Sequence, residues 1–288
     1  ISEDAVAVIN PKRDDCNYIY KHLAWAWVAF KLVQALVYDF FDKKEAEKYL
    51  KSTIDIAAIW TVADCMRLTW ENRIIVQEWL KQIRNSRSLW IKKLIWDKIN
   101  EDLDADIFWF QIWPRLNAAW RMDSPYKAVN LLLNNSENID KIISEIEQLN
   151  EKRKYFTKEF VEDALWRVNK EDNIIFYISA IEHGIIWIVA WRITEQFHKP
   201  SIVLKDEWDK LVASCRSPEY FSIVDILDKY KDYFVTFWWH KQAASFTITK
   251  EKFREFKTNI LKEVNSLDFS ENKRIVNIDK VIALEEIW

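Results

Sequence analysis

Residues 201–217 read SIVLKDEWDKLVASCRS, in which two apolar runs flank a short polar segment around Trp208. Two β-rich runs joined by a short polar turn are typical of a β-hairpin. The hairpin follows a β-rich run at 173–179 and a segment at 185–197 that has the apolar spacing of a helix. This alternation of strand and helix predicts an α/β fold.

The same alternation continues toward the C-terminus. After the hairpin, with strands at 201–204 and 210–215, we expect a helix at 222–230, strands at 233–237 and 245–249, and an amphipathic helix at 250–265. A last apolar stretch, Arg274–Leu284, indicates one strand of a further domain.

The first 170 residues have mainly helical periodicity. A short apolar segment, Ile54–Asp64, ends in an acidic residue, and a long charged helix at 137–168 is typical of a connection between two domains. We therefore expect domains at 1–135 and 170–267, a connecting helix at 136–169, and the start of another domain at 268–288. The other helices are expected at 22–41, 43–51, 71–84 and 89–99, from Pro114, and from Pro125 to about Asn134.

Composition narrows the possible partners and compartment. The 288 residues are 50% hydrophobic and carry a net charge of −3, so a nucleic-acid site would have to be a local basic patch. The three cysteines fit no zinc pattern and indicate a reducing compartment. No apolar run reaches the roughly 18 residues of a membrane-spanning helix. We expect a soluble, cytoplasmic protein with no membrane partner, and the start at Ile1 indicates a truncated N-terminus.

The ratio of glycine to tryptophan is abnormal, with 1 Gly and 17 Trp. Together they make up about 6% of the chain, close to the roughly 7% glycine of an average protein. Several tryptophans also occupy positions where glycine is usual, such as Trp208 in the hairpin turn and Trp70 before a helical pattern.

We hypothesise that these tryptophans are glycines read with the wrong genetic code, because the codon UGA means Trp in some bacterial codes and Gly in others. If so, several of Trp70, Trp208, Trp238 and Trp239 should have positive φ or be strained. The alternative is a tryptophan-rich module that stacks nucleic-acid bases.

Five motifs carry a resemblance to a known family once their tryptophans are taken as glycines. They are HLAWAWVAFKL (22–32), IWTVADCMRL (59–68), IWPRLNAAWRM (112–122), HGIIWIVAWR (183–192) and FWWHKQAA (237–244). In this order and spacing they resemble the RecJ exonucleases, which belong to the DHH phosphoesterase superfamily. The resemblance extends over nearly the whole chain, from just after the Asp-His-His motif that names the superfamily.

The resemblance also assigns the expected domains. Residues 1–135 would be the C-terminal part of a DHH domain, 170–267 a DHH-associated substrate-binding domain, and 268–288 the start of an OB-fold domain. The chain would then be truncated at both ends relative to the family.

Asp64 follows a buried-looking apolar segment. On the residues alone it is either a metal ligand or an aspartate at a helix end or turn, and neither is favoured. Hydrolysis by two divalent metals needs several carboxylates and imidazoles. The resemblance implies that Asp64 is a catalytic metal ligand for Mn²⁺ or Mg²⁺, and that the other ligands precede Ile1.

Two groups of residues are candidates for substrate binding. Arg115, Asn117 and Arg121 lie around a short predicted helix, where guanidinium groups could bind phosphates, although lone arginines are more often on a solvated face. The resemblance implies that they contact DNA. In the second half it implies the same role for the pair Arg216 and Ser217 and for the triplet Trp238, Trp239 and His240, which we expect in a strand-to-helix loop.

The resemblance implies metal-dependent 5′→3′ hydrolysis of single-stranded DNA to mononucleotides, in DNA repair and recombination. The strand would thread a groove between the two lobes, and a single-strand-binding protein and a helicase would be partners. The chain alone is expected to be inactive, because it contains at most one metal ligand. Two alternatives stay open: a smaller DHH phosphoesterase acting on short oligonucleotides or cyclic dinucleotides, and a non-catalytic RecJ-like replication scaffold.

Overall fold

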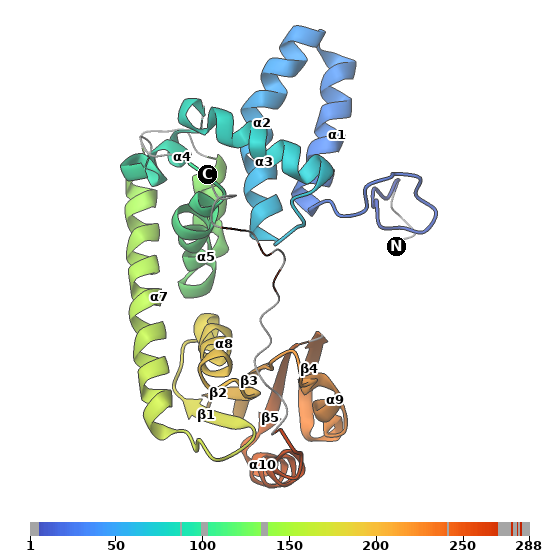
Figure 1. Ribbon diagram of the computed structural model, residues 1–288. Coiled ribbons are helices and arrows are strands. Elements are labelled where there is room, and N and C mark those ends of the chain that lie inside the picture. Colours follow the sequence, from blue (N-terminus) through green and yellow to red (C-terminus); the bar gives the residue numbers. More distant parts are fainter. Residues whose placement is uncertain are drawn as a thin grey trace. The chain divides into compact units, whose positions relative to one another are not determined.

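The computed structural model describes residues 6–86, 88–98, 103–133, 138–240 and 242–269, and three single residues near the C-terminus. The chain divides into two compact units, Ile1–Lys152 and Arg153–Trp288 (Figure 1). The boundary falls inside the long predicted connecting helix. The strand predicted at Arg274–Leu284 lies almost entirely outside the described residues, so the expected OB-fold start stays a prediction.

The first unit is helical. Its core contains the rings of Trp79 and Phe108, whose centroids are 4.3 Å apart, together with many aliphatic side chains. A π-helical turn, η3 (Phe108–Ile112), leads directly into α5. The helices are α1 (Trp25–Phe40), α2 (Lys43–Ala63), α3 (Trp70–Gln82), α4 (Leu89–Leu94), α5 (Trp113–Met122), α6 (Pro125–Leu133) and the first part of α7 (Ile139–Arg167), with short 3₁₀ turns η1 (Ile83–Asn85) and η2 (Trp96–Lys98).

Helix α2 differs from its prediction, because it continues from Lys43 to Ala63 instead of ending near residue 51. The hydroxyl side chains that follow residue 51 bond back to the helix: Ser52 Oγ donates to the Tyr49 carbonyl at 2.6 Å, and Thr53 Oγ1 donates to the Leu50 carbonyl at 3.2 Å. Such back-bonding lets Ser and Thr sit inside a helix. The predicted apolar segment 54–64 is therefore the second half of α2.

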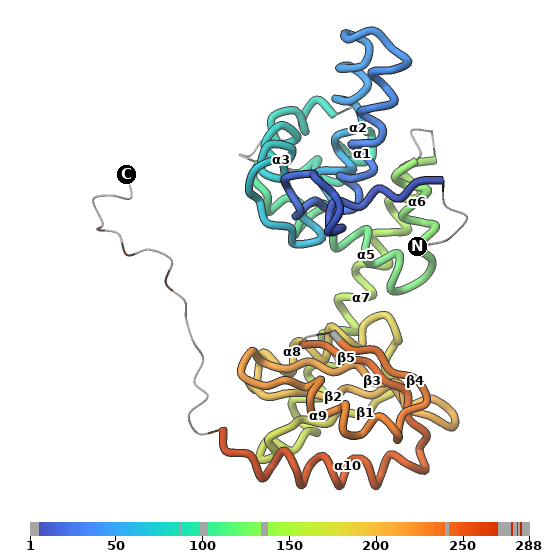
Figure 2. The backbone as a smooth tube through the Cα atoms, turned by 90° about the vertical axis from the view of Figure 1, so that its right-hand side faces the viewer, coloured from blue at the N-terminus to red at the C-terminus, as the bar shows by residue number. Residues whose placement is uncertain are grey.

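The second unit is an α/β domain, as predicted. Its described residues form one sheet in the order β1-β2-β3-β5-β4, with β1 and β2 parallel and the other pairs antiparallel. Helix α8 connects β1 to β2 and covers one face, while α9 and α10 cover the other (Figures 1 and 2). The elements are β1 (Ile175–Ser179), α8 (Ile186–Phe197), β2 (Ser201–Asp206), β3 (Lys210–Arg216), α9 (Ile223–Asp228), β4 (Phe234–His240), β5 (Ala243–Thr249) and α10 (Lys250–Asn265).

The hairpin predicted around Trp208 is present. Strands β2 and β3 pair antiparallel, and the Glu207 backbone N–H donates to the Lys210 carbonyl at 3.0 Å, which closes a two-residue loop. The local sequence pattern was sufficient here because a hairpin is a local structure.

The prediction of a strand-to-helix loop at Trp238, Trp239 and His240 is wrong. All three lie in β4 and pair with Ser245, Ala244 and Ala243 of β5. The loop prediction treated the two tryptophans as glycines, whereas a run of aromatic residues as printed favours an extended strand.

The prediction of positive φ at several tryptophans is largely wrong as well. Within the described residues, the non-glycine residues with positive φ are Cys65, Trp70 and His198. Only one of the four named tryptophans, Trp70 at +49°, is therefore in the left-handed region.

Candidate nucleic-acid interface

Asp64 caps the C-terminus of α2, and its backbone N–H donates to the Trp60 carbonyl at 3.0 Å. Burial raises the pKa of its carboxyl group, and the charge of Lys12 opposes that shift. The part of the chain that the structure describes contains no group of three or more His, Cys, Asp or Glu side chains that could hold a metal ion. Asp64 thus lies at a helix end, and its role as a ligand stays a prediction.

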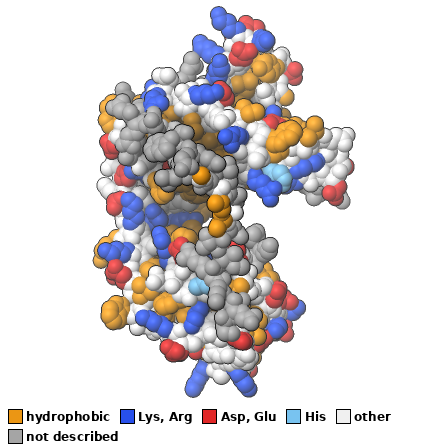
Figure 3. All heavy atoms as spheres, in the orientation of Figure 1, with side chains coloured by type: hydrophobic (Ala, Val, Ile, Leu, Met, Phe, Trp, Pro, Cys, Tyr) orange, Lys and Arg blue, Asp and Glu red, His pale blue; other side chains and the backbone are white. Residues whose placement is uncertain are grey.

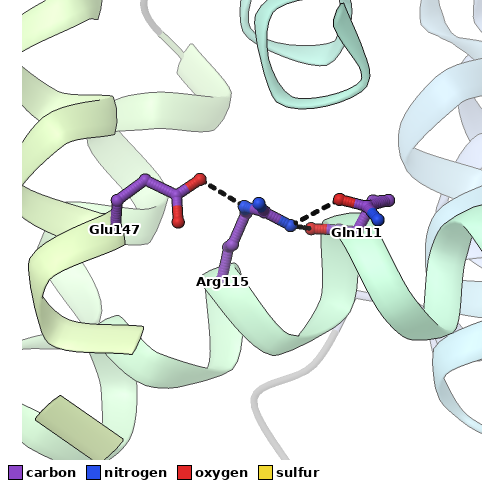
Figure 4. A network of polar contacts seen from close by, with 3 residues as sticks. All are labelled: Gln111, Arg115 and Glu147. Carbon is purple, nitrogen blue, oxygen red and sulfur yellow. Dashed lines mark hydrogen bonds and ion pairs between the residues drawn. The ribbon is translucent and has the colours of Figure 1, made fainter. Parts of the chain in front are cut away.

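Arg115 projects from the first turns of α5 toward α7 (Figure 4). Its Nη1 donates to the Gln111 carbonyl at 2.7 Å and to Gln111 Oε1 at 2.9 Å, and its Nε donates to the Glu147 carboxylate. The side chain is only 19% exposed. The Arg115 guanidinium, which was predicted to bind DNA, therefore forms three hydrogen bonds within the first unit.

Asn117 and Arg121 lie on a different face of α5 from Arg115. They are four residues apart, so they are neighbours on the helix surface, and both are half-buried. Leu116, Ala118 and Ala119 form the buried side of the same helix. The structure thus brings Asn117 and Arg121 together and separates Arg115 from them.

Arg216 ends β3 in the second unit. Its Nη1 donates to the Cys215 carbonyl at 2.7 Å, and its guanidinium carbon is 5.8 Å from the ring centroid of Trp187. Burial lowers the pKa of the guanidinium. No carboxylate among the described residues forms an ion pair with it. Within the part of the chain that the structure describes, Arg216 is therefore a half-buried cation without a carboxylate partner.

Ser217 follows Arg216 and is also buried. Its backbone N–H donates to the Gln242 carbonyl at 3.2 Å, but its Oγ has no hydrogen-bond partner among the described residues. Buried hydroxyl groups are nearly always hydrogen-bonded, so an unpaired one needs an explanation. Ser217 follows Arg216 directly in the chain, and a hydroxyl donor and a guanidinium without a carboxylate partner among the described residues are both groups that can bind phosphate oxygens.

The strand register places His240 near this pair. Arg216 of β3 and His240 of β4 both lie opposite Ala243 of β5, one on each side of it. The sheet therefore brings three of the predicted substrate-binding residues, Arg216, Ser217 and His240, to one end of three neighbouring strands.

The two tryptophans of β4 have different environments. Trp238 is exposed, whereas Trp239 stacks on Phe237 with the ring centroids 4.8 Å apart. The Trp239 indole nitrogen is buried without a hydrogen-bond partner in the described part of the chain.

One buried charged residue, Asp55, was missed by the sequence interpretation. This residue of α2 is 3% exposed and accepts hydrogen bonds from Ser86 Oγ at 2.7 Å and Ser88 Oγ at 3.0 Å. Burial raises the pKa of its carboxyl group. The signal was an aspartate between two isoleucines in an apolar segment.

Charge is interspersed on the molecular surface. On the face drawn in Figure 3, Lys and Arg side chains alternate with Asp and Glu and form no single basic surface. None of the helices within the described residues is long and apolar enough to span a bilayer. On this face, a nucleic-acid site would have to be local.

Comparison of the fold with solved structures defines its class. A RecJ exonuclease bound to manganese superposes with a TM-score of 0.71 at 26% identity, covering 84% of this chain and 60% of that one. The RecJ of Thermus thermophilus in complex with Mg²⁺ gives a TM-score of 0.69 at 26% identity, covering 76% of this chain and 35% of that one. The fold is thus that of a section of a RecJ exonuclease.

The curated relatives agree. The chain is 30% identical to the single-stranded-DNA-specific exonuclease RecJ of Bacillus subtilis over 99% of its length and 36% of the relative's. It is 31% identical to the RecJ of Escherichia coli over 88% of its length and 48% of the relative's. No family model matches. The chain is therefore a RecJ homologue, as its motifs predicted, and it spans about a third to a half of the curated relatives it matches.

Proposed function

We propose that the chain is the substrate-gripping section of a metal-dependent exonuclease that hydrolyses single-stranded DNA from the 5′ end to mononucleotides, in DNA repair and recombination. The homology to RecJ carries the enzyme class. Within the chain, the observation that best supports the proposal is the sequence pair Arg216 and Ser217. Among the described residues, the guanidinium of Arg216 has no carboxylate partner and the buried hydroxyl of Ser217 has no hydrogen-bond partner.

The proposal gives the sheet of the second unit a binding role. Arg216 would bind one phosphate of the DNA backbone with its fork of N–H donors, and Ser217 would donate its hydroxyl to the same group. His240 lies two strands from Arg216, with β5 between them, and stays a predicted DNA contact. Phosphate contacts carry no sequence information, as an enzyme that degrades any single strand requires.

The predicted divalent-metal site at Asp64 is distinct from the phosphate-binding site proposed at Arg216 and Ser217. The structural neighbours are RecJ in complex with Mn²⁺ or Mg²⁺. Asp64 is the one predicted ligand in this chain, and the described residues assemble no metal site around it. Asp64 therefore stays a predicted ligand of a Mn²⁺ or Mg²⁺ centre.

The alternatives differ in what they would bind. A smaller phosphoesterase for short oligonucleotides or cyclic dinucleotides would not need the long helix α7, which has 29 residues and lies within the helix predicted at 137–168. A scaffold would bind other proteins instead of DNA. A single-strand-binding protein, a helicase and a cytoplasmic location stay predictions.

The experiment is a titration of a fluorescently labelled single-stranded oligonucleotide, read by anisotropy at several salt concentrations. We expect Arg216→Ala to weaken binding roughly tenfold and to reduce the slope of log K against log salt by about 0.7, the value for one lost phosphate contact on a single strand. Arg254→Ala is the matched control, because Arg254 is an exposed arginine of α10 in the same unit. Equal affinities for all three proteins would contradict the proposed site.

A further inference from the structure

The tryptophans of this chain are exposed to an unusual degree. Tryptophan is normally among the most buried residues on average. Of the sixteen tryptophans that the structure describes, nine are exposed and three are buried. The buried ones are Trp27, Trp79 and Trp90; the exposed ones are Trp25, Trp70, Trp96, Trp109, Trp120, Trp166, Trp191, Trp208 and Trp238.

Trp70 has a backbone conformation that suits glycine. It is the first residue of α3, with φ +49°, directly after Thr69 in extended conformation at φ −119°. The left-handed region is unfavourable for a bulky side chain because Cβ approaches the backbone, whereas glycine enters it freely. The Trp70 ring is 71% exposed, so its packing compensates little of this strain.

Trp208 occupies a position that suits glycine by a separate criterion. It is the first residue of the two-residue loop between Glu207 and Lys210, and Asp209 is the second. The turns that match the twist of such hairpins have positive φ at the first loop position, and the type II′ turn has glycine there. Trp208 does not have positive φ, and its ring is 97% exposed. As printed, the hairpin therefore lacks its favoured turn, which the sequence Gly-Asp would provide.

We infer that the natural protein carries glycine at Trp70 and Trp208, and at the other exposed tryptophans, through UGA codons that its organism reads as glycine. Glycine at the nine exposed positions would raise the glycine count from 1 to 10 and lower the tryptophan count from 17 to 8. The inference does not extend to Trp27, Trp79 and Trp90, because their rings are buried in the core of the first unit. It is independent of the nuclease proposal, since it rests on backbone conformation, turn type and exposure.

The direct test reads the codons of the gene and the masses of tryptic peptides from the protein made in its own organism. We expect UGA at codons 70 and 208, and peptide masses that correspond to glycine at both positions. UGG codons, or peptide masses that correspond to tryptophan, at these two positions would overturn the inference.

The strain attributed to Trp70 can be tested on the chain with the printed sequence, by measuring its folding equilibrium constant. Trp70→Gly removes the left-handed strain, and we expect the folding equilibrium constant to rise roughly 3- to 30-fold. Trp25→Gly is the matched control: Trp25 is likewise the first residue of a helix and is 61% exposed, but its φ is not positive. It should leave the constant unchanged or lower it by roughly fivefold at most.

A third variant separates backbone strain from loss of the ring. Trp70→Asn should give part of the gain, because asparagine tolerates the left-handed region better than tryptophan does. Urea unfolding curves measure all three variants. A Trp70→Gly chain no more stable than Trp25→Gly would count against glycine at position 70.

Discussion

Arg216 and Asp55 are both charged side chains that the fold removes from water, but their partners differ. Two serine hydroxyls satisfy the Asp55 carboxylate, at 2.7 and 3.0 Å. Arg216 has a backbone carbonyl and an aromatic ring beside it, and no carboxylate among the described residues. A satisfied buried charge indicates a structural role, whereas an unpaired one indicates a place for a ligand.

The structural role of Asp55 leads to a prediction about pH. Because its pKa is raised in the folded state, folding takes up a proton that the unfolded chain releases. The resulting stabilisation is fully present below the unfolded value of 3.8 and is lost as the pH rises through the folded pKa. Asp55→Asn should remove this component of the pH dependence, measured as the free energy of urea unfolding at a series of pH values.

Two further variants control that measurement. Asp55→Ala leaves the hydroxyls of Ser86 and Ser88 without their acceptor, so we expect a loss of about 1–3 kcal/mol near neutral pH. Asp97→Asn removes an exposed carboxylate and should leave the pH dependence as it is. An unchanged pH dependence in Asp55→Asn would show that the Asp55 carboxyl titrates normally.

At the scale of single residues, the sequence identified candidates but not their partners. The motif around Arg115 predicted a DNA contact, yet Glu147 lies 32 residues further along the chain, and no local pattern joins the two. Arg216 and His240 are likewise distant in sequence and become neighbours only through the register of β3, β5 and β4.

At the scale of elements, local patterns predicted most helices and strands. The hairpin at Trp208 and the long helix α7 were confirmed because their signals are contained within them. An error arose in α2, where the local sequence pattern predicted a helix end that the structure does not have. The helix predicted at 43–51 continues to Ala63, because the hydroxyls of Ser52 and Thr53 bond back to carbonyls of the same helix.

The contact between α5 and α7 gives a prediction at this scale. Glu147→Gln removes the charge that holds Arg115, and we expect the first unit to lose about 1–3 kcal/mol of unfolding free energy, because the ion pair is half-buried. Glu162→Gln is the control, since Glu162 pairs with Lys158 at 3.9 Å on the exposed surface of the same helix and should cost less than about 0.5 kcal/mol.

The same variant distinguishes the two roles proposed for Arg115. If Arg115 also contacts DNA, Glu147→Gln should retain or strengthen single-strand binding, because the guanidinium is released, while Arg115→Ala should weaken it. Weakened stability with unchanged binding in both variants would make Arg115 a purely structural residue.

At the scale of the whole molecule, the enzyme class rests on homology to RecJ, because the described residues alone form no metal centre. The two-unit fold and its RecJ relatives were predicted from motif order, but the metal centre was not found within the described residues. We therefore expect the chain alone, as printed and with glycine at the exposed tryptophan positions, to release no nucleotides from single-stranded DNA in Mn²⁺. Robust digestion by either form would show that this section holds a complete catalytic site.

The central claim is that this section of the protein binds single-stranded DNA. The most direct measurement compares the affinity of the chain for a labelled single-stranded oligonucleotide with its affinity for the duplex of the same sequence at fixed ionic strength, by anisotropy. The account predicts tighter binding of the single strand, with a preference that Arg216→Ala reduces and Arg254→Ala leaves intact. Equal affinity for both forms of DNA, or no binding to either by the folded chain, would contradict it.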